Sequence, residues 1–406
     1  MEPAEREDCE GSFLSRLCWH IFGEYPPQPG GVSDYTSLVA AGLAEHGDEV
    51  HVWCGSSSNA DSQPKFPGVV VHRDLGEVSP SDLRRVGEQL DRFPAPRRIL
   101  VQWVPHAYGR RAMNVGFCRW LLHRASRSGD TVEIMAHECF LRFGRTWKQT
   151  AAAAVQRWMT ILLMRAVERV WISIPEWEDL FRPYTLGRKV VFEQLPIPSN
   201  IPVLHNPEAV ESIRRRYAPG GEILMGHFGT HGRPITSILE PILTTLGEEP
   251  TGQSILLIGV GSEEFRAELT NRKPALEPLV HATGALSAAD LSAHLAACDL
   301  IIQPYPDGVS SRRGSLMAAL AHGRPIVSTY GELSAPFWKE SGVLALAPVG
   351  DVAPFVKLVR ELSRDASARE RMGRAAKKFY DERFALSHTV RSIRGAAMQE
   401  YSECAS

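Results

Sequence analysis

The sequence predicts an α/β protein built from two doubly wound domains. At 406 residues the chain is too long for one core, so two domains of about 200 residues each are expected. Short apolar strands alternate with helical segments in both halves, and a proline-rich stretch separates the halves. Strands that alternate with helices favour parallel pairing through right-handed crossovers, which produces Rossmann-like sheets.

The first half begins with an apolar run and then alternates. Strands are expected at residues 17–22, 49–54, 69–72, 99–103, 132–136 and 170–173. Helices are expected at residues 34–46, 82–93, 116–127 and 150–168. Ser33 stands where a side chain can cap the first of these helices.

The stretch 195–202 contains three prolines in eight residues and is typical of an interdomain linker. After it, strands are expected at 223–228, 254–258, 280–283, 300–303, 326–328 and 343–346. Helices are expected at 235–246, 263–271, 288–297, 315–322, 353–363, 368–382 and 387–401. Two such domains place a ligand cleft between the carboxyl ends of their strands.

Composition excludes several classes of protein. The net charge of −2 provides no overall basic field for nucleic acid. The seven cysteines are scattered singly, which favours reduced thiols in a cytosol over disulfides or a metal site. Charged residues near the N-terminus argue against a signal peptide, and charges interrupt the longest apolar stretch, 150–170. A soluble, cytoplasmic protein is expected.

The stretch 305–327 carries the strongest functional signal. An apolar strand leads into a turn rich in glycine and serine, and the turn leads into a short helix. Free N–H groups at a helix N-terminus bind phosphate, and arginine forks grip it in bidentate fashion. The residues expected to hold a phosphate here are Ser310, Ser311, Arg312, Arg313, Gly314 and Ser315.

Several stretches together resemble the retaining GT-B glycosyltransferases of glycosyltransferase family 4. The likeness runs from about Leu17 to the final helix. The stretches that carry it are Glu24–Tyr35 with Gly30-Gly31, Leu43–Val52, Gly229-Thr230, Ile258–Gly261, Gly284–Ser287 with Leu286, and Ala318–Val327.

This resemblance implies two Rossmann-like domains facing across a cleft, at residues 1–195 and 203–385, with residues 386–406 returning to the first domain. It implies a nucleotide-sugar donor held mainly by the second domain and an acceptor held by the first. It also implies retained anomeric configuration, no obligatory metal and no cofactor. Gly30, Gly31, Gly229, Thr230 and Leu286 are then expected to contact the donor.

The sequence departs from the family at two glutamates that usually stand eight positions apart. Those positions fall on Ser310 and Ala318. Asp307 is the nearest carboxylate and is the catalytic candidate in their place if the turn carries a three-residue insertion. A basic pair that usually follows the Gly229 position is also absent. Arg312 and Arg313 are the expected replacements, with Arg233 a weaker candidate, because a buried diphosphate needs positive charge.

Acceptor-side candidates follow two strands of the first domain. His137 matches the family's active-site histidine, with His106 as the alternative, and Glu138 either orients an acceptor hydroxyl or caps a turn. Gln102 and Tyr108 are expected to line the acceptor pocket. The acceptor is a small molecule, a saccharide or a lipid-linked sugar.

The basic, aromatic-rich segment 140–169 has two interpretations. It is either a core helix with a solvated basic face, which we favour, or an interfacial membrane helix. The first interpretation favours a soluble acceptor and at most peripheral membrane contact.

Three other functions were compared with glycosyl transfer. A dinucleotide-dependent oxidoreductase would need G-x-G-x-x-G after the first strand, which residues 26–31 do not provide. A nucleotide-sugar epimerase of the same architecture, or a non-catalytic nucleotide-sugar-binding relative, remain alternatives.

Overall fold

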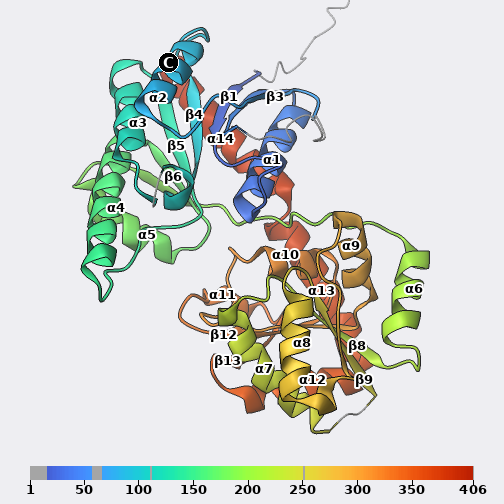
Figure 1. Cartoon of the computed structure of the whole chain (residues 1–406). Helices are drawn as coiled ribbons and strands as arrows, with labels where there is room; N and C mark the ends of the chain where they lie inside the picture. The colour runs from blue at the N-terminus through green and yellow to red at the C-terminus, as the bar shows by residue number, and fades with distance from the viewer. Residues whose placement is uncertain (1–15, 57–65, 110–111, 250–251, 406) are drawn as a thin grey trace, which may run out of the picture.

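The computed structural model describes residues 16–56, 66–109, 112–249 and 252–405. Two parallel sheets, one of seven strands and one of six, each form the centre of a domain (Figure 1). The two domains are joined by an extended segment at 195–206 and by the long C-terminal helices. Within the described residues, no helix is both long enough and apolar enough to span a bilayer.

The first sheet has the strand order β3-β2-β1-β4-β5-β6-β7, with all neighbours parallel. Its strands are β1 (Cys18–Phe22), β2 (Glu49–Trp53), β3 (Val69–His72), β4 (Arg98–Trp103), β5 (Thr131–Ala136), β6 (Arg169–Ile172) and β7 (Val191–Gln194). Its helices are α1 (Gly31–Glu45), α2 (Pro80–Leu90), α3 (Val115–Arg127), α4 (Trp147–Ala166) and α5 (Glu176–Phe181).

Period-two alternation sends the residues of these strands to two separate cores. One core joins residues such as Trp19 and Val50 to α1 and to the final helix, α14 (Leu386–Ala405). The other joins residues such as Phe22 and Trp53 to α2, α3 and α4. The central strand β4 is buried along its whole length because both faces are covered.

The second sheet has the order β10-β9-β8-β11-β12-β13 and is also parallel. Its strands are β8 (Ile223–Phe228), β9 (Gln253–Ile258), β10 (Val280–Ala282), β11 (Leu300–Gln303), β12 (Ile326–Tyr330) and β13 (Ala345–Pro348). One face packs on α6 (Pro207–Tyr217), α9 (Ala288–Ala297), α10 (Gly314–Ala321) and α13 (Ala366–Arg383). The other packs on α7 (Arg233–Gly247), α8 (Ser262–Arg272) and α12 (Val352–Arg364).

The final helix leaves the second domain and packs on the first. Val390, Ile393 and Ala397 of α14 are buried in the core that α1 shares. Arg394 forms a buried bidentate ion pair with Asp48, at 2.8 and 3.1 Å. The same carboxylate accepts from Trp19 Nε1 on β1, so one buried acid fixes the helix to the sheet.

The predicted fold class is confirmed, and each predicted strand and helix is present with ends displaced by a few residues. Four elements are not predicted from the sequence: β7, α5, α6 and the short helix α11 (Phe337–Glu340). The edge strand β7 contains Glu193 and is largely exposed, so it carries no continuous apolar run. Helix α6 is rich in arginine and glutamate, and only Tyr217 of it is buried.

Candidate functional site

The carboxyl-terminal ends of strands from both sheets meet at the segment that joins the domains. The Ser311 hydroxyl, in the turn after β11, donates to the Ser173 carbonyl after β6, at 2.7 Å. The Ile197 N–H, in the joining segment, donates to the Ser311 carbonyl, at 3.3 Å. The predicted phosphate-binding turn therefore lies directly against the first domain.

The turn between β11 and α10 is held tightly to β12. The Tyr305 and Val309 N–H groups both donate to Thr329, the first to its hydroxyl and the second to its carbonyl, at 2.8 Å each. Gly308 has φ +88°, and a Cβ there would lie 2.3 Å from the Gly331 nitrogen. Only glycine fits this close approach, so the geometry of the turn is fixed before any ligand binds.

Asp307 lies between the two predicted phosphate-binding arginines. Its two carboxylate oxygens accept from Arg312 and Arg313, one oxygen each. The three side chains are 19%, 27% and 23% exposed, so the cluster is half-buried but reachable. Burial, followed by the neighbouring Arg313, lowers the pKa of Arg312, whereas Asp307 and Glu138 raise it.

Helix α10 begins at Gly314. As at any helix start, its first N–H groups lack an intrahelical partner, and no capping side chain bonds to them. Helix α1 begins at Gly31, after Gly30 with φ +148°, and also lacks a side-chain cap. Asn200 lies between the two helices. Its amide donates to Asp34 of α1 at 2.7 Å, and its oxygen lies 3.9 Å from a Cβ built on Gly314. Two helix N-termini therefore converge from opposite domains, an arrangement that favours an anion.

Gln303 is a functional candidate that the sequence analysis missed. It is 2% exposed at the end of β11, and its amide donates to the Phe228 carbonyl and to the Ser315 hydroxyl, at 2.8 and 3.2 Å. Ser315 also bonds to the Tyr305 hydroxyl at 2.9 Å. Gln303 thus ties the start of α10 to the end of β8. In the sequence, the only indication of this role is that a polar residue ends an apolar strand.

The predicted donor residues after β8 lie beside this network. Gly229 is close to Gln303, since a Cβ there would lie 4.0 Å from its amide nitrogen. Gly259, with φ +113°, leaves no room for a Cβ, which would approach the Gly229 carbonyl to 2.5 Å. Thr230 is exposed, and Leu286 is partly buried against the domain core. Gly31 has open space around its Cα, with nothing within 4 Å of an added Cβ.

Arg233, the weaker candidate, starts α7 and lines a different hollow. That hollow, of about 580 Å³, lies between α7 and α8, and its walls include His231, Glu240 and Glu264. None of the residues of the Asp307 turn lines it. Arg312 and Arg313 are therefore the cations placed for a phosphate at the start of α10.

His137 follows β5 and is held in one orientation. Its Nε2 bonds to Gln102 Oε1 at 2.8 Å, and its ring meets Tyr35 edge-on with centroids 4.8 Å apart. Burial lowers the pKa of His137 to about 3, so the imidazole is neutral near pH 7. Since Nε2–H then donates to Gln102, Nδ1 is left as an acceptor.

Two predicted acceptor-binding residues are buried and bond to other groups of the protein. Gln102 is fully buried and bonds to His137 through Oε1, whereas its Nε2 has no partner among the described residues. Tyr108 is 1% exposed, and its hydroxyl donates to the Phe22 and Gln102 carbonyls at 3.0 and 2.9 Å. Both residues follow or end β4, whose carboxyl end is covered by the 3-10 turn Pro105–Ala107. The side chain of His106, the alternative to His137, lies outside the described residues.

Some buried polar atoms without a partner lie near His137 and in the turn between β11 and α10. Among the described residues they include Ser33 Oγ, Tyr35 Oη, Gln102 Nε2, Ser310 Oγ, Arg312 Nε and Arg313 Nε. Such atoms are costly unless something bonds to them, and a polar ligand can do so. Glu138 is exposed next to them, on the face towards Arg312.

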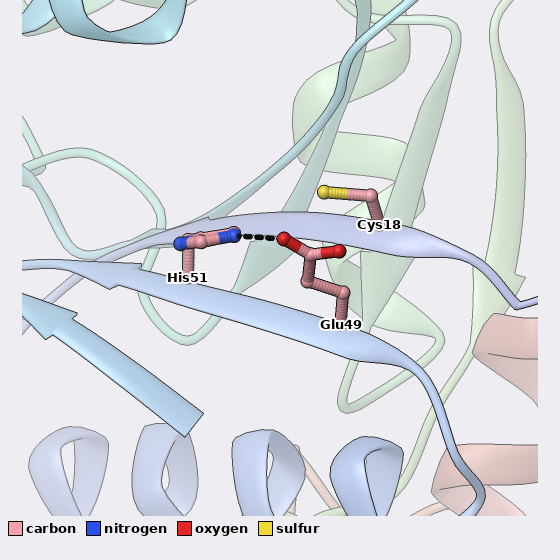
Figure 2. A group of neighbouring side chains, drawn as sticks. All are labelled: Cys18, Glu49 and His51. Carbon is pink, nitrogen blue, oxygen red and sulfur yellow. Dashed lines mark hydrogen bonds and ion pairs between the residues drawn. The ribbon is translucent and has the colours of Figure 1, made fainter. Parts of the chain in front are cut away.

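The described residues contain one group with metal-ligand spacing, formed by Cys18, Glu49 and His51 (Figure 2). Cys18 and Glu49 pair at the amino ends of β1 and β2, the sheet edge opposite His137. His51 bonds to Glu49 at 2.9 Å through Nε2 and to His72 at 3.0 Å through Nδ1. Both ring nitrogens are thus satisfied within the protein. An ion held there would not reach the donor turn.

Two facing Rossmann-like domains with a C-terminal helix that returns to the first domain define the GT-B fold. Residues 235–365, within the second domain, match the family described as Glycosyl transferases group 1. The predicted resemblance to GT-B glycosyltransferases is confirmed. No curated protein sequence matches this chain.

Solved structures share the fold along nearly the whole chain at low identity. Sucrose-phosphate synthase from Thermosynechococcus elongatus has a TM-score of 0.73 at 14% identity, over 96% of this chain and 100% of that one. Anabaena HepE, solved with UDP and glucose, has a TM-score of 0.68 at 14% identity, over 95% and 100%. A trehalose-phosphate synthase from Burkholderia xenovorans, solved with glucose-6-phosphate, has 0.65 at 11% identity, over 95% and 99%.

Proposed function

We propose that this protein transfers a sugar from a nucleoside-diphosphate sugar to an acceptor hydroxyl, with retention of anomeric configuration. The observation that carries the proposal is the turn at Asp307–Ser315, which holds two arginines and an uncapped helix N-terminus against the first domain. The match to the glycosyl transferases group 1 family covers this turn and helix. Neighbours of the same fold were solved with UDP, glucose or a sugar phosphate.

The donor side stabilises the leaving group in this proposal. Arg312 and Arg313 exchange their bonds with Asp307 for bonds to the diphosphate, and the first N–H groups of α10 bind the same anion. The charge that develops on the diphosphate as its bond to the sugar breaks is then met by fixed cations and dipoles. Asp307 holds both guanidinium groups in place before the donor arrives.

The acceptor side positions the sugar and the attacking hydroxyl. His137 is neutral, so it accepts a hydrogen bond from a sugar hydroxyl at Nδ1 and supplies no positive charge. The acceptor oxygen forms its bond to the anomeric carbon as the bond to the phosphate oxygen breaks. The proton of the acceptor passes to the departing phosphate oxygen, which leaves on the same face and so retains the configuration.

A binding screen and a product assay test the proposal. Nucleoside diphosphates and their sugars should raise the Tm of the purified chain, because a ligand specific for the folded state stabilises it by mass action. With a donor so identified, release of nucleoside diphosphate should depend on an added acceptor. Proton NMR of the product should show the anomeric configuration of the donor, and an inverted product would contradict retention.

A non-catalytic donor-binding protein is the second candidate. It is favoured by Ser310 and Ala318, both buried, which stand where the family usually has glutamates. Asp307 cannot act freely in their place while both arginines hold its oxygens. Tight diphosphate binding without turnover on any acceptor would support this candidate. An epimerase would interconvert donor sugars in the absence of an acceptor.

A further inference from the structure

The outward side of α4 carries an apolar stripe beside exposed polar and basic residues. Trp147 and Trp158 are 76% and 53% exposed, and Ala151 and Ala154 are exposed between them. At 3.6 residues per turn these four positions lie on one side of the helix, and the tryptophans stand about 16 Å apart along its axis. The predicted basic residues Lys148 and Arg165 are exposed on this helix, but an apolar stripe interrupts its solvent-facing side.

The loop before α4 extends this apolar stripe. Leu141 and Phe143 are 50% and 59% exposed. Arg157 holds the loop down, since its guanidinium donates to the Leu141 carbonyl at 2.9 Å and stacks on Phe143 at 3.9 Å. Gln156 accepts from the Leu141 N–H at 2.7 Å. The two apolar side chains are thus presented outward by a built contact.

Positive charge surrounds the stripe. Residues 139–167 contain five basic residues and no acidic ones, a net charge of +5 in a chain whose total is −2. Arg142, Arg145 and Lys148 are exposed, and none of them forms an ion pair within the described residues. Helix α13 shows what a solvated face looks like in the same protein: Arg374, Lys377 and Lys378 each pair with an acid four residues away.

We propose that the surface formed by the loop 141–145 and the outer face of α4 binds the surface of an anionic lipid bilayer. Exposed tryptophans insert at the boundary between headgroups and acyl chains, and unpaired cations around them attract anionic lipids. A nucleic acid would instead need cations along its phosphates, whereas alanines occupy the middle of this stripe. Figure 1 shows α4 on the outer side of the first domain, away from the second domain.

The surface adjoins the candidate site through the chain itself. The segment that begins at His137 and Glu138 continues directly into Leu141 and Phe143. A bilayer bound here would lie beside the acceptor side of the site. That the acceptor is carried by lipid is a consequence that rests on the proposed sugar transfer, whereas bilayer binding does not.

Vesicle binding by the full chain tests the surface without donor or acceptor. Sedimentation with vesicles of phosphatidylglycerol and phosphatidylcholine should capture the protein, and pure phosphatidylcholine should capture far less. Binding should weaken as salt rises. Tryptophan emission should shift to the blue, because of the nine tryptophans only Trp147 and Trp158 are exposed.

Two variants separate the apolar and the electrostatic contributions. Trp147→Ser with Trp158→Ser should weaken binding by about a hundredfold and abolish the emission shift. Arg142→Gln with Arg145→Gln and Lys148→Gln should also weaken it by about a hundredfold. The matched controls are Val203→Ser, an exposed apolar residue elsewhere, and Arg371→Gln with Arg374→Gln and Lys378→Gln on α13. Both controls should bind as the unaltered chain does.

Three results would overturn the proposal. They are equal binding by the variants and the unaltered chain, stronger binding to a single-stranded oligonucleotide than to the vesicles, and a dimer in sedimentation equilibrium that depends on the two tryptophans. Vesicle binding without any release of nucleoside diphosphate would leave this surface standing and count against the proposed transfer. Transfer to a water-soluble acceptor without vesicle binding would support the proposed sugar transfer and overturn the proposal of a bilayer-binding surface.

Discussion

The two domains meet with different chemistry at their facing edges. On the second domain, Asp307, Arg312 and Arg313 pair with one another and stay partly exposed. On the first domain, Gln102, Tyr35 and His137 form a neutral, mostly buried group with polar atoms left unpaired. The charged edge is complementary to an anion, and the neutral edge to hydroxyl groups. One donor molecule that carries both a diphosphate and a sugar would use both edges.

The largest expected effect comes from removing the charged edge. Arg312→Ala with Arg313→Ala should lower kcat/KM, with a loss of transition-state stabilisation of about 3–4 kcal/mol. The reason is that fixed cations stabilise the departing diphosphate in the proposed reaction. Isothermal titration calorimetry should also show weaker binding of the nucleoside diphosphate. Arg233→Ala, at the hollow between α7 and α8, is the matched control and should change neither quantity. Unchanged kcat/KM in the double variant would refute the assignment of the turn.

Changes on the neutral edge should separate catalysis from diphosphate binding. His137→Ala should lower kcat, with a loss of transition-state stabilisation of about 2 kcal/mol. It should leave the affinity for nucleoside diphosphate within twofold, since the proposed diphosphate site lies on the other domain. Gln102→Ala should lower kcat less, because it removes only the partner that orients His137. Equal losses in kcat and in diphosphate affinity would contradict the proposal that the charged edge binds the diphosphate while the neutral edge binds the sugar.

The smallest effect is a difference in pH dependence. Burial lowers the pKa of His137 from 6.5 to about 3, so below pH 6.5 the unfolded chain takes up a proton that the folded chain refuses. Its contribution to stability is complete above pH 6.5 and falls by about 1–2 kcal/mol at pH 5. Chemical denaturation of His137→Gln should therefore show a shallower loss of stability between pH 7 and pH 5. An identical slope in both proteins would mean that His137 titrates normally.

The arginines of the charged edge keep their charge across this pH range, which sharpens the contrast. Although burial lowers the pKa of Arg312, the guanidinium is paired with Asp307, which favours its charged form. Binding of an intact nucleoside-diphosphate sugar, whose doubly esterified diphosphate has no proton to lose in this range, should consequently stay constant from pH 6 to pH 8. This follows from the guanidinium group, which remains protonated under all such conditions.

Sequence alone determined the alternation of strands and helices, the parallel sheets and the division near the prolines at 195–202. These features follow from the local periodicity of apolar residues and from general rules for how the chain connects strands and helices. Both can be recognised from residues that are close together in the sequence. It also placed Arg312, Arg313 and His137 at strand ends, because carboxyl ends of parallel strands collect at one edge. It did not find β7 or α6, whose residues are too polar to carry a periodic apolar signal.

Only the tertiary structure decided what these residues touch. Tyr108 and Gln102 are predicted from the sequence to bind a ligand, but both are buried. Tyr108 bonds to two backbone carbonyls, and Gln102 bonds to His137. Gln303 and Asn200 join segments that are far apart in the chain. The outer face of α4 could not be assigned either, since its tryptophans fit a core as well as a surface. Burial depends on how helices pack against a sheet, and that is a property of the whole fold.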